Sequence, residues 1–300
     1  MQALVTGATG FLGRALVARL DRPRVLSRDP SRAKASLPAA EAFPWVAEAG
    51  PPPAESVEGA DAVFHLAGDP VAEGRWTAEK KRRIRDSRIL GTRNLVLALG
   101  AAKARPKVLV AASAVGIYGA RGDETLTEAS AQGSDFLATV CAEWEAEARK
   151  AEAHGVRVVS LRIGLVLGAG GGALAAMLLP FRLGLGAPLG NGRQWMPWIH
   201  RDDVLGLALF AAGKDSLSGP VNAVSPGAVT NRDFTKALGR ALGRPTFAPP
   251  VPRFVLRAGF GEFAGVLLAS QRVVPAAALA AGYRFLHGEI TGALREAVGP

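Results

Sequence analysis

Short apolar runs alternate with longer amphipathic stretches through the first half of the chain. The apolar runs cover residues 3–5, 24–26, 62–66, 108–112 and 156–161. Between them, apolar positions recur with helical spacing over 11–20, 77–102 and 136–153. Strands that alternate with helices in this way predict an α/β fold, a doubly wound parallel sheet of the Rossmann type with right-handed crossovers.

The pattern changes after Arg162, where glycine-rich and proline-rich segments such as 168–172 and 245–252 separate shorter amphipathic pieces. This shift predicts a second, smaller C-terminal α+β domain. We place the dinucleotide-binding domain at 1–163, with 203–228 returning to it. The smaller substrate domain is expected to comprise 164–202 and 229–300.

Composition narrows the class of protein. The 300 residues are 49% hydrophobic and include one cysteine, Cys141, so an intrachain disulfide is excluded. Four histidines lie far apart in the sequence, and we expect no metal site. The apolar run at Ala3 follows Met1 and Gln2 directly, which leaves no room for a secretory leader and predicts a cytoplasmic protein. No uninterrupted apolar stretch reaches the roughly 20 residues of a membrane span, so no membrane partner is expected.

The net charge of +10 raises the question of nucleic-acid binding. The basic cluster at 80–85 is flanked by Glu79 and Asp86 and has no interleaved aromatic residues. It therefore predicts a solvated helix face and no nucleic-acid partner.

The segment 6–13, TGATGFLG, follows the first predicted strand and opens a helix. In this context Gly7 permits a tight turn, Gly10 allows close approach of a pyrophosphate, and Gly13 lets the helix pack closely on the sheet. The segment predicts a dinucleotide site formed by Gly7, Thr9, Gly10, Phe11, Leu12 and Gly13.

The end of the second predicted strand indicates which dinucleotide binds. Ser27 and Arg28 stand there, with Arg32 one helical turn further on. A hydroxyl and two guanidinium groups suit a 2′-phosphate, whereas an acidic side chain at the strand end would suit a free ribose. Asp29 precedes Pro30 and is expected to cap the next helix. We therefore predict NADP(H) in preference to NAD(H).

Several motifs together resemble the extended short-chain dehydrogenase/reductase superfamily. They are TGATGFLG at 6–13, HLAG at 65–68, GTRNL at 91–95, SAVGIYG at 113–119, LRIG at 161–164 and WIHRDD at 198–203. The segments 190–200 and 250–283 resemble more narrowly the "epimerase family" group of NAD(P)-dependent nucleoside-diphosphate-sugar epimerase-like proteins. The resemblance implies that further residues line the cofactor: Leu66, Ala67, Gly68, Ser113, Arg162, Ile163 and Gly164.

The chain departs from the superfamily at its Tyr-x-x-x-Lys pair. The matching helix places Phe136 or Leu137 at the tyrosine position and Val140 or Cys141 at the lysine position. None of these side chains carries a cation or suits general acid-base chemistry, and Cys141 is expected to be a small core residue. The proton donor must come from elsewhere, and the candidates are Ser113, Tyr118, His200, Glu145 or a bound water. For His200, a buried structural histidine is the alternative.

The substrate segment also departs from nucleotide-sugar epimerases, which place an arginine where this chain has Met196. Arg193, Trp195 and Trp198 are the candidates for a substrate pocket, with core packing as the alternative for the tryptophans.

Two functions remain at this point. One is an NADP(H)-dependent oxidoreductase or epimerase acting on a small carbonyl or hydroxyl substrate. The other is an NADP(H)-binding or redox-sensing protein without turnover. Pairing through the long helices beside the fifth strand would give a homodimer, and the sequence leaves that open.

Overall fold

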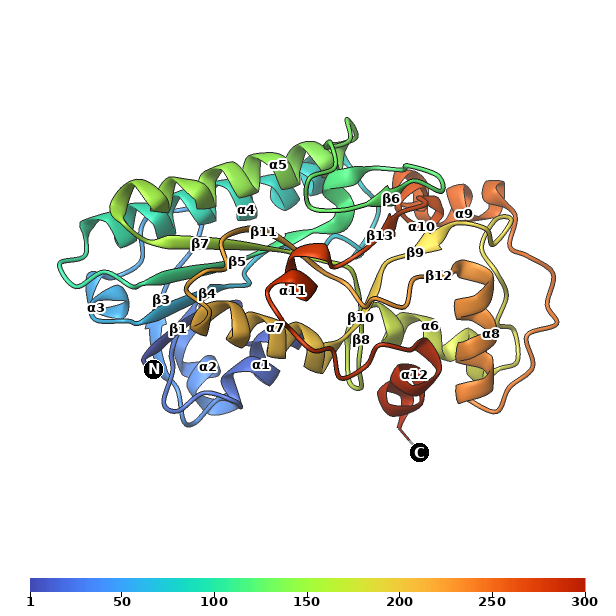
Figure 1. Cartoon of the computed structure of the whole chain (residues 1–300), viewed down its shortest axis with the longest axis horizontal. Coiled ribbons are helices and arrows are strands. Elements are labelled where there is room, and N and C mark those ends of the chain that lie inside the picture. Colours follow the sequence, from blue (N-terminus) through green and yellow to red (C-terminus); the bar gives the residue numbers. More distant parts are fainter. Residues whose placement is uncertain (300) are drawn as a thin grey trace.

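A seven-stranded sheet forms the centre of the computed structural model, which describes residues 1–299 (Figure 1). Every neighbouring pair in it is parallel. The strand order is β11-β7-β5-β4-β1-β2-β3. The strands are β1 Ala3–Thr6, β2 Arg24–Ser27, β3 Glu41–Pro44, β4 Ala62–His65, β5 Val108–Ala114, β7 Arg157–Ile163 and β11 Gly219–Ala223.

Helices cover both faces of this sheet (Figure 1). One face carries α1 Phe11–Val17, α2 Pro30–Ser36 and α7 Arg201–Gly213, and the other carries α3 Ala54–Val57, α4 Ala78–Ala101 and α5 Phe136–Arg149. Within β1, Ala3 and Val5 join the first core cluster while Leu4 joins the second. This alternation explains why the strands are continuously apolar, because side chains on both faces are buried.

Most of the remaining elements form a smaller region. It contains three two-stranded sheets, which pair β8 with β10, β9 with β12, and β6 with β13. Its core contains Leu174, Phe181, Trp198, Phe234 and Leu294. The strands are β6 Thr125–Leu126, β8 Leu165–Leu167, β9 Trp195–Met196, β10 Trp198–His200, β12 Val229–Thr230 and β13 Arg272–Val273. The α-helices are α6 Gly172–Arg182, α8 Asn231–Ala241, α9 Arg253–Phe260, α10 Ala264–Leu268, α11 Ala276–Ala280 and α12 Ile290–Val298. Short 3₁₀ turns lie at Val115–Tyr118, Lys150–His154 and Gly261–Phe263.

The predicted fold class is confirmed, and the differences lie in detail. Strand β3 was not predicted because its residues lie at the sheet edge and are only partly buried, so they form no apolar run. The helix predicted over 136–153 ends at Arg149 and continues as a 3₁₀ turn. Ala278 of α11 belongs to the core of the large sheet, so part of the segment 229–300 packs on the first domain.

The basic cluster on α4 matches the predicted solvated face at Arg82, Arg83 and Arg85, whose side chains are exposed, and differs from it at Lys80. Lys80 is 5% exposed and pairs with Asp69 at 2.5 Å. The neighbouring basic residues pair within the chain as well: Lys81 with Glu262, Arg82 with Glu79, and Arg85 with Glu143. Most of the positive charge of this segment is therefore balanced internally. Within residues 1–299, no helix has the length and apolar character needed to cross a membrane.

Candidate functional site

The glycine turn between β1 and α1 is held by close backbone contacts. Gly7 has φ +67°, and a Cβ atom there would lie 2.8 Å from the carbonyl carbon of Leu66. A Cβ atom on Gly13 would lie 2.1 Å from the Gly7 oxygen. Glycine is therefore required at both positions, for the left-handed backbone and for the close approach of α1 to the turn.

Helix α1 differs from its neighbours in how it begins. Asp29, Thr77 and Asp135 cap α2, α4 and α5 by accepting a hydrogen bond from the backbone N–H three residues later. The N-cap residue of α1 is Gly10, and among residues 1–299 no side chain caps this helix. The first turn of α1 thus keeps its N–H donors for a ligand, and these donors suit the pyrophosphate of a dinucleotide.

The loop after β4, which contains Leu66, Ala67 and Gly68, is anchored by a buried polar chain. The hydroxyl of Thr6 accepts the N–H groups of Leu66 and Ala67, each at 3.1 Å, and contacts Nδ1 of His65 at 2.7 Å. Nε2 of His65 lies 2.9 Å from the Thr92 hydroxyl. Burial, assisted by the charge of Arg88, lowers the pKa of His65 to about 4. The imidazole is therefore neutral and acts as a fixed link. Thr6 and Thr92 belong to two of the motifs quoted from the sequence, but the motifs did not show that His65 joins them.

At the end of β2, the residues predicted to select the 2′-phosphate are exposed or half-exposed. The Ser27 hydroxyl donates to the Asp29 carbonyl at 3.0 Å, and Asp29 caps α2 by accepting from Arg32 N–H, as predicted. The side chains of Arg28 and Arg32 are exposed, and within residues 1–299 neither makes a hydrogen bond or ion pair. Two guanidinium groups beside the glycine turn are thus available to an anion.

The side chain of Phe11 connects the glycine turn to the second domain. Its ring lies under the loop 168–172, where a Cβ atom on Gly171 would be 2.6 Å from Cδ2 of Phe11. The Arg201 guanidinium lies 5.8 Å from the centre of the same ring. This packing accounts for the glycines of the loop, and it commits the Phe11 ring to contacts within the chain.

A second buried polar chain lies at the carboxyl ends of β5 and β7. The Ser113 hydroxyl donates to Oε1 of Glu145 at 2.6 Å, and Arg162 holds both carboxylate oxygens of Glu145 at 2.9 Å. Burial alone would lower the pKa of Arg162, but the hydrogen bonds and charge of Glu145 raise it above the usual value. The guanidinium is therefore committed to Glu145, which changes the expectation that Arg162 lines the cofactor.

The series of hydrogen bonds that begins at Ser113 continues from Arg162 through Tyr118 to Asn222 on β11. The Tyr118 hydroxyl accepts from Nη1 of Arg162 at 2.9 Å and donates to Oδ1 of Asn222 at 2.6 Å. Tyr118 is fully buried, and burial raises the pKa of its phenol against the opposing charge of Arg162. A phenol enclosed in this way supports Arg162 and does not reach a substrate. Asn222 was not predicted, because it lies 104 residues from its partner.

Glu145 and Arg162 also face a polar cavity of about 210 Å³. The other lining residues are Ile117, Ser130, Gln132, Ala142 and Arg149. A cavity of this volume with two arginines and a carboxylate in its wall has room and partners for ordered water. Ser113 itself is 3% exposed, so Glu145 is the link between Ser113 and the cavity.

Helix α5 presents apolar side chains where the superfamily has its reactive pair. A Cβ atom on Gly116 would lie 3.4 Å from Leu137 and 3.9 Å from the Cys141 sulfur. Cys141 is 4% exposed, and burial raises the pKa of its thiol to about 12. The thiol is therefore a small core group, in agreement with the interpretation from the sequence.

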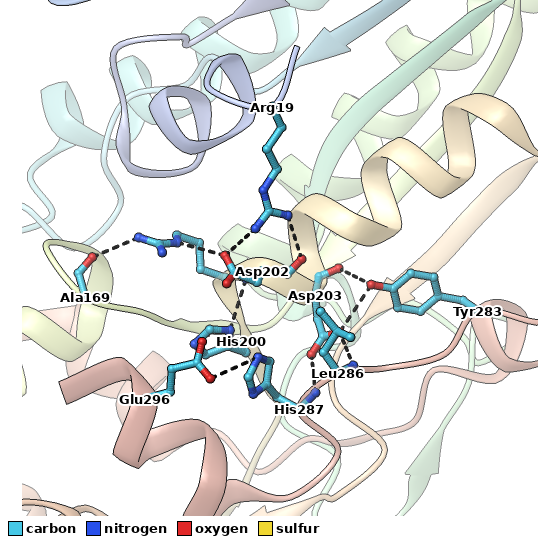
Figure 2. A network of polar contacts seen from close by, with 10 residues as sticks. Arg19, Ala169, His200, Asp202, Asp203, Tyr283, Leu286, His287 and Glu296 are labelled. Atoms are coloured by element: carbon cyan, nitrogen blue, oxygen red, sulfur yellow. Dashed lines mark hydrogen bonds and ion pairs between the residues drawn. The ribbon is translucent and has the colours of Figure 1, made fainter. Parts of the chain in front are cut away.

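His200 lies at the junction between the two domains, and Figure 2 shows its surroundings. Its Nδ1 accepts the Asp202 N–H at 3.3 Å, and its ring centre lies 3.9 Å from that of His287. The donor atoms of His200, Asp202, His287 and Glu296 lie within 4.8 Å of one another. Asp202 already pairs with Arg19 at 2.7 Å, so this cluster contains its own compensating cation. His200 caps α7 by accepting the Asp202 N–H, and this use of its Nδ1 supports the structural alternative over a catalytic role.

The three candidates for a substrate pocket separate in the structure. Trp198 is fully buried in the core of the smaller region, and its indole N–H donates to the Gly227 carbonyl at 2.7 Å. Core packing, the alternative that the sequence left open, therefore explains Trp198. Trp195 is half-buried beneath Arg272, whose guanidinium lies 4.7 Å from its ring centre, and Arg193 is exposed.

Two more residues that the resemblance placed near the cofactor, Ile163 and Gly164, lie where β7 leaves the large sheet. Ile163 packs against the buried cluster of Ile89, Ala112 and Trp144. A Cβ atom on Gly164 would lie 2.5 Å from the Pro197 oxygen, so this glycine permits the segment around Pro197 to approach the end of β7 closely.

A parallel sheet in this strand order, with a glycine turn at its first crossover, defines a dinucleotide-binding Rossmann protein. The model of the NAD dependent epimerase/dehydratase family matches residues 3–223, and residues 251–297 match a domain of unknown function, DUF1731. The chain belongs to the NAD dependent epimerase/dehydratase family, which confirms the resemblance.

Relatives match along nearly the whole chain. The "Epimerase family protein SDR39U1 homolog, chloroplastic" of Arabidopsis thaliana is 43% identical over 302 residues, covering 98% of this chain and 86% of the relative. The epimerase family protein YfhF of Bacillus subtilis is 36% identical over 303 residues, covering 99% and 98%. The crystal structure of human epimerase family protein SDR39U1 (isoform 2) with NADPH superposes with a TM-score of 0.87 at 35% identity, covering 99% of both chains.

Proposed function

We propose that this chain binds NADP(H) and acts as an oxidoreductase or epimerase on a small carbonyl or hydroxyl substrate, with Ser113 and Glu145 moving the proton. The hydrogen-bonded chain from Ser113 through Glu145 to Arg162, at the carboxyl ends of β5 and β7, carries the proposal. The choice of NADP(H) is supported by the exposed Arg28 and Arg32 beside Ser27, and by the human relative determined with NADPH.

The glycine turn and the loop of residues 66–68 suit the dinucleotide, since they expose main chain where a pyrophosphate must approach closely. When bound, NADP⁺ supplies the acceptor for the hydride at its nicotinamide C4. The chain itself must then remove the proton from a substrate hydroxyl, or return it to a carbonyl oxygen in the reverse direction.

Ser113 is oriented for this proton transfer. Its hydroxyl hydrogen is directed to Glu145, so its oxygen lone pairs are free to accept a hydrogen bond from a substrate hydroxyl. As the substrate proton moves to the Ser113 oxygen, the Ser113 proton moves to the Glu145 carboxylate. Glu145 can exchange that proton with water in the adjoining cavity of about 210 Å³. Arg162 holds the carboxylate in place throughout.

A screen of carbonyl and alcohol substrates, followed by NADPH absorbance, tests the proposal. Ser113→Ala should lower kcat by about 100-fold or more while leaving NADPH affinity unchanged, because the general acid-base step is lost. Glu145→Gln should have a similar effect on kcat, and it should also cost about 3–5 kcal/mol of stability because it leaves the buried Arg162 without its charge partner.

Glu143→Gln is the matched control on the same helix. Glu143 forms an ion pair with Arg85 in which both side chains are more than a third exposed, so the loss should be at most about 1 kcal/mol. Absence of turnover over a broad substrate panel, or full activity of Ser113→Ala, would contradict the proposed relay.

A second candidate is an NADP(H)-binding protein without turnover. The apolar Leu137 and the un-ionised Cys141, with a thiol pKa raised to about 12, favour it, because α5 supplies no proton-active group where the superfamily has one. Tight NADPH binding with no activity in the screen is the result that would select this candidate.

A further inference from the structure

Arg88 on α4 lies at the carboxyl edge of the sheet, beside the loop that follows β4. A Cβ atom on Gly68 would be 3.0 Å from Cζ of Arg88, so the guanidinium packs directly against the main chain of that loop. On its other side, Cζ lies 5.1 Å from the centre of the Trp144 ring on α5. Arg88 thus lies between the loop and α5, where the second half of a dinucleotide would extend from the glycine turn.

The hydrogen bonds of Arg88 leave part of its guanidinium without a partner. Nη1 donates to the carbonyls of Asp69 and Ile84, each at 3.0 Å, and within residues 1–299 no carboxylate pairs with this side chain. Arg88 is half-buried, and burial lowers the pKa of its guanidinium. The donors of Arg88 that meet no protein group among residues 1–299 can therefore bind an acceptor oxygen that arrives with a ligand.

A second hydrogen-bond donor near Arg88 has no acceptor. The indole N–H of Trp144 is buried and has no hydrogen-bond partner among residues 1–299. Trp144 packs with Ile89, Ala112 and partly buried Leu66 at the carboxyl ends of β4 and β5. Two donor-only groups without acceptors in one place point to a ligand rich in acceptor oxygens.

The nicotinamide half of the cofactor has such oxygens, in its ribose hydroxyls and carboxamide. The glycine turn contacts the same loop at Leu66 and Ala67, one residue before the contact with Arg88. The two contacts therefore mark successive parts of one extended ligand. Cys141, at the position where the superfamily resemblance expects a lysine, feels the charge of Arg88, which partly opposes the rise in its thiol pKa.

We propose that Arg88, reaching from α4, binds the ribose of the nicotinamide half of NADP(H) and supplies there the positive charge that α5 lacks. The inference rests on the proposed binding of NADP(H) and is independent of whether the protein turns over a substrate. It divides the arginines by task, with Arg28 and Arg32 at the adenine end and Arg88 at the nicotinamide end.

Equilibrium titration with two ligands tests this division. NADPH contains both halves, whereas adenosine 2′,5′-bisphosphate contains only the adenine half. Arg88→Met should weaken NADPH binding by about 10- to 100-fold, the effect of losing hydrogen bonds to a charged donor. The affinity for the bisphosphate should stay within about 2-fold, which also shows that the variant is folded. Arg88→Lys should recover part of the NADPH affinity, because it keeps the charge without the fork of donors.

Arg85→Met is the matched control, one turn earlier on α4, where the side chain pairs with Glu143 at 2.7 Å. It should change neither affinity. Equal weakening of both ligands by Arg88→Met, or no weakening of NADPH, would overturn the assignment. Wild-type protein that binds neither ligand would overturn the cofactor proposal together with this one, whereas NADPH binding without turnover would overturn the proton relay alone.

Discussion

The proposed cofactor site is formed by main chain at its β1–α1 end, whereas at its β5–β7 end it is built from polar side chains. Gly7 and Gly13 act through the atoms they lack, because a Cβ atom at either position would lie within 3 Å of neighbouring backbone atoms. At the other end, Ser113, Glu145 and Arg162 act through side chains that come from two strands and a helix.

Because the two ends are built differently, substitutions should affect them in different ways. Backbone contacts cannot relax around an added methyl group, so the first end should fail through geometry. A polar network fails through an unmet charge or hydrogen bond, and its loss should depend on pH and on the partner that remains. The following predictions are ordered from the largest expected effect to the smallest.

Gly13→Ala should break the main-chain end most severely. Its Cβ atom would overlap the Gly7 oxygen at 2.1 Å, so α1 must move away from the turn. We expect NADPH affinity to fall by roughly 100-fold or more, equivalent to about 3 kcal/mol of overpacking. Titration with NADPH measures this effect. Gly50→Ala, where a Cβ would meet nothing within 4 Å, is the control, and equal affinities for the two variants would contradict the steric argument.

His65 tests how a side chain supports the main-chain end, because its hydrogen bonds to Thr6 and Thr92 hold the loop after β4. Its pKa is lowered from 6.5 to about 4, so the unfolded chain binds the extra proton between those pH values. The stability of the wild type should therefore be complete above pH 6.5 and should fall as the pH drops toward 4, by up to about 3 kcal/mol from this residue. Urea unfolding between about pH 7 and pH 4 measures the slope. His65→Gln should flatten that part of the curve, and an unchanged slope would count against the neutral imidazole.

Arg28→Ala should have the smallest effect, because its side chain is exposed at the end of β2. A charge-assisted hydrogen bond to the 2′-phosphate is worth about 1.5 kcal/mol, or roughly 10-fold in affinity. NADPH binding should weaken by that factor while NADH binding stays the same. If NADH were bound as tightly as NADPH by the wild type, the assignment of this end to a 2′-phosphate would fail.

The main-chain end could be predicted from the sequence because it is local. Gly7, Gly10 and Gly13 lie within one turn and the start of one helix, and their spacing carries the geometry. The capping role of Asp29 was equally local, since the residue that donates to it lies three positions later. Cys141 was interpreted correctly from its apolar neighbours on one helix.

The side-chain end could not be predicted in the same way. Glu145 was only one of several candidates, and its bonds to Ser113 and Arg162 span 32 and 17 residues. For Trp198 the sequence left a pocket and core packing both open, because an isolated tryptophan gives no sign of whether its ring faces a pocket or a core. Arg88 lies just beyond the basic cluster at 80–85 and belongs to no motif that pointed to a ligand.

The sequence by itself determined the alternation of strands and helices, the glycine turn and the absence of the usual tyrosine and lysine, because each depends on residues close together in the chain. Only the tertiary structure decided which polar groups meet. The sheet brings the ends of β4, β5 and β7 side by side and α4 against α5, so that Arg88 on α4 lies against Trp144 on α5, where we propose that the nicotinamide half of the cofactor binds. Burial then decides their chemistry, because a charge or donor removed from water must find its partner nearby.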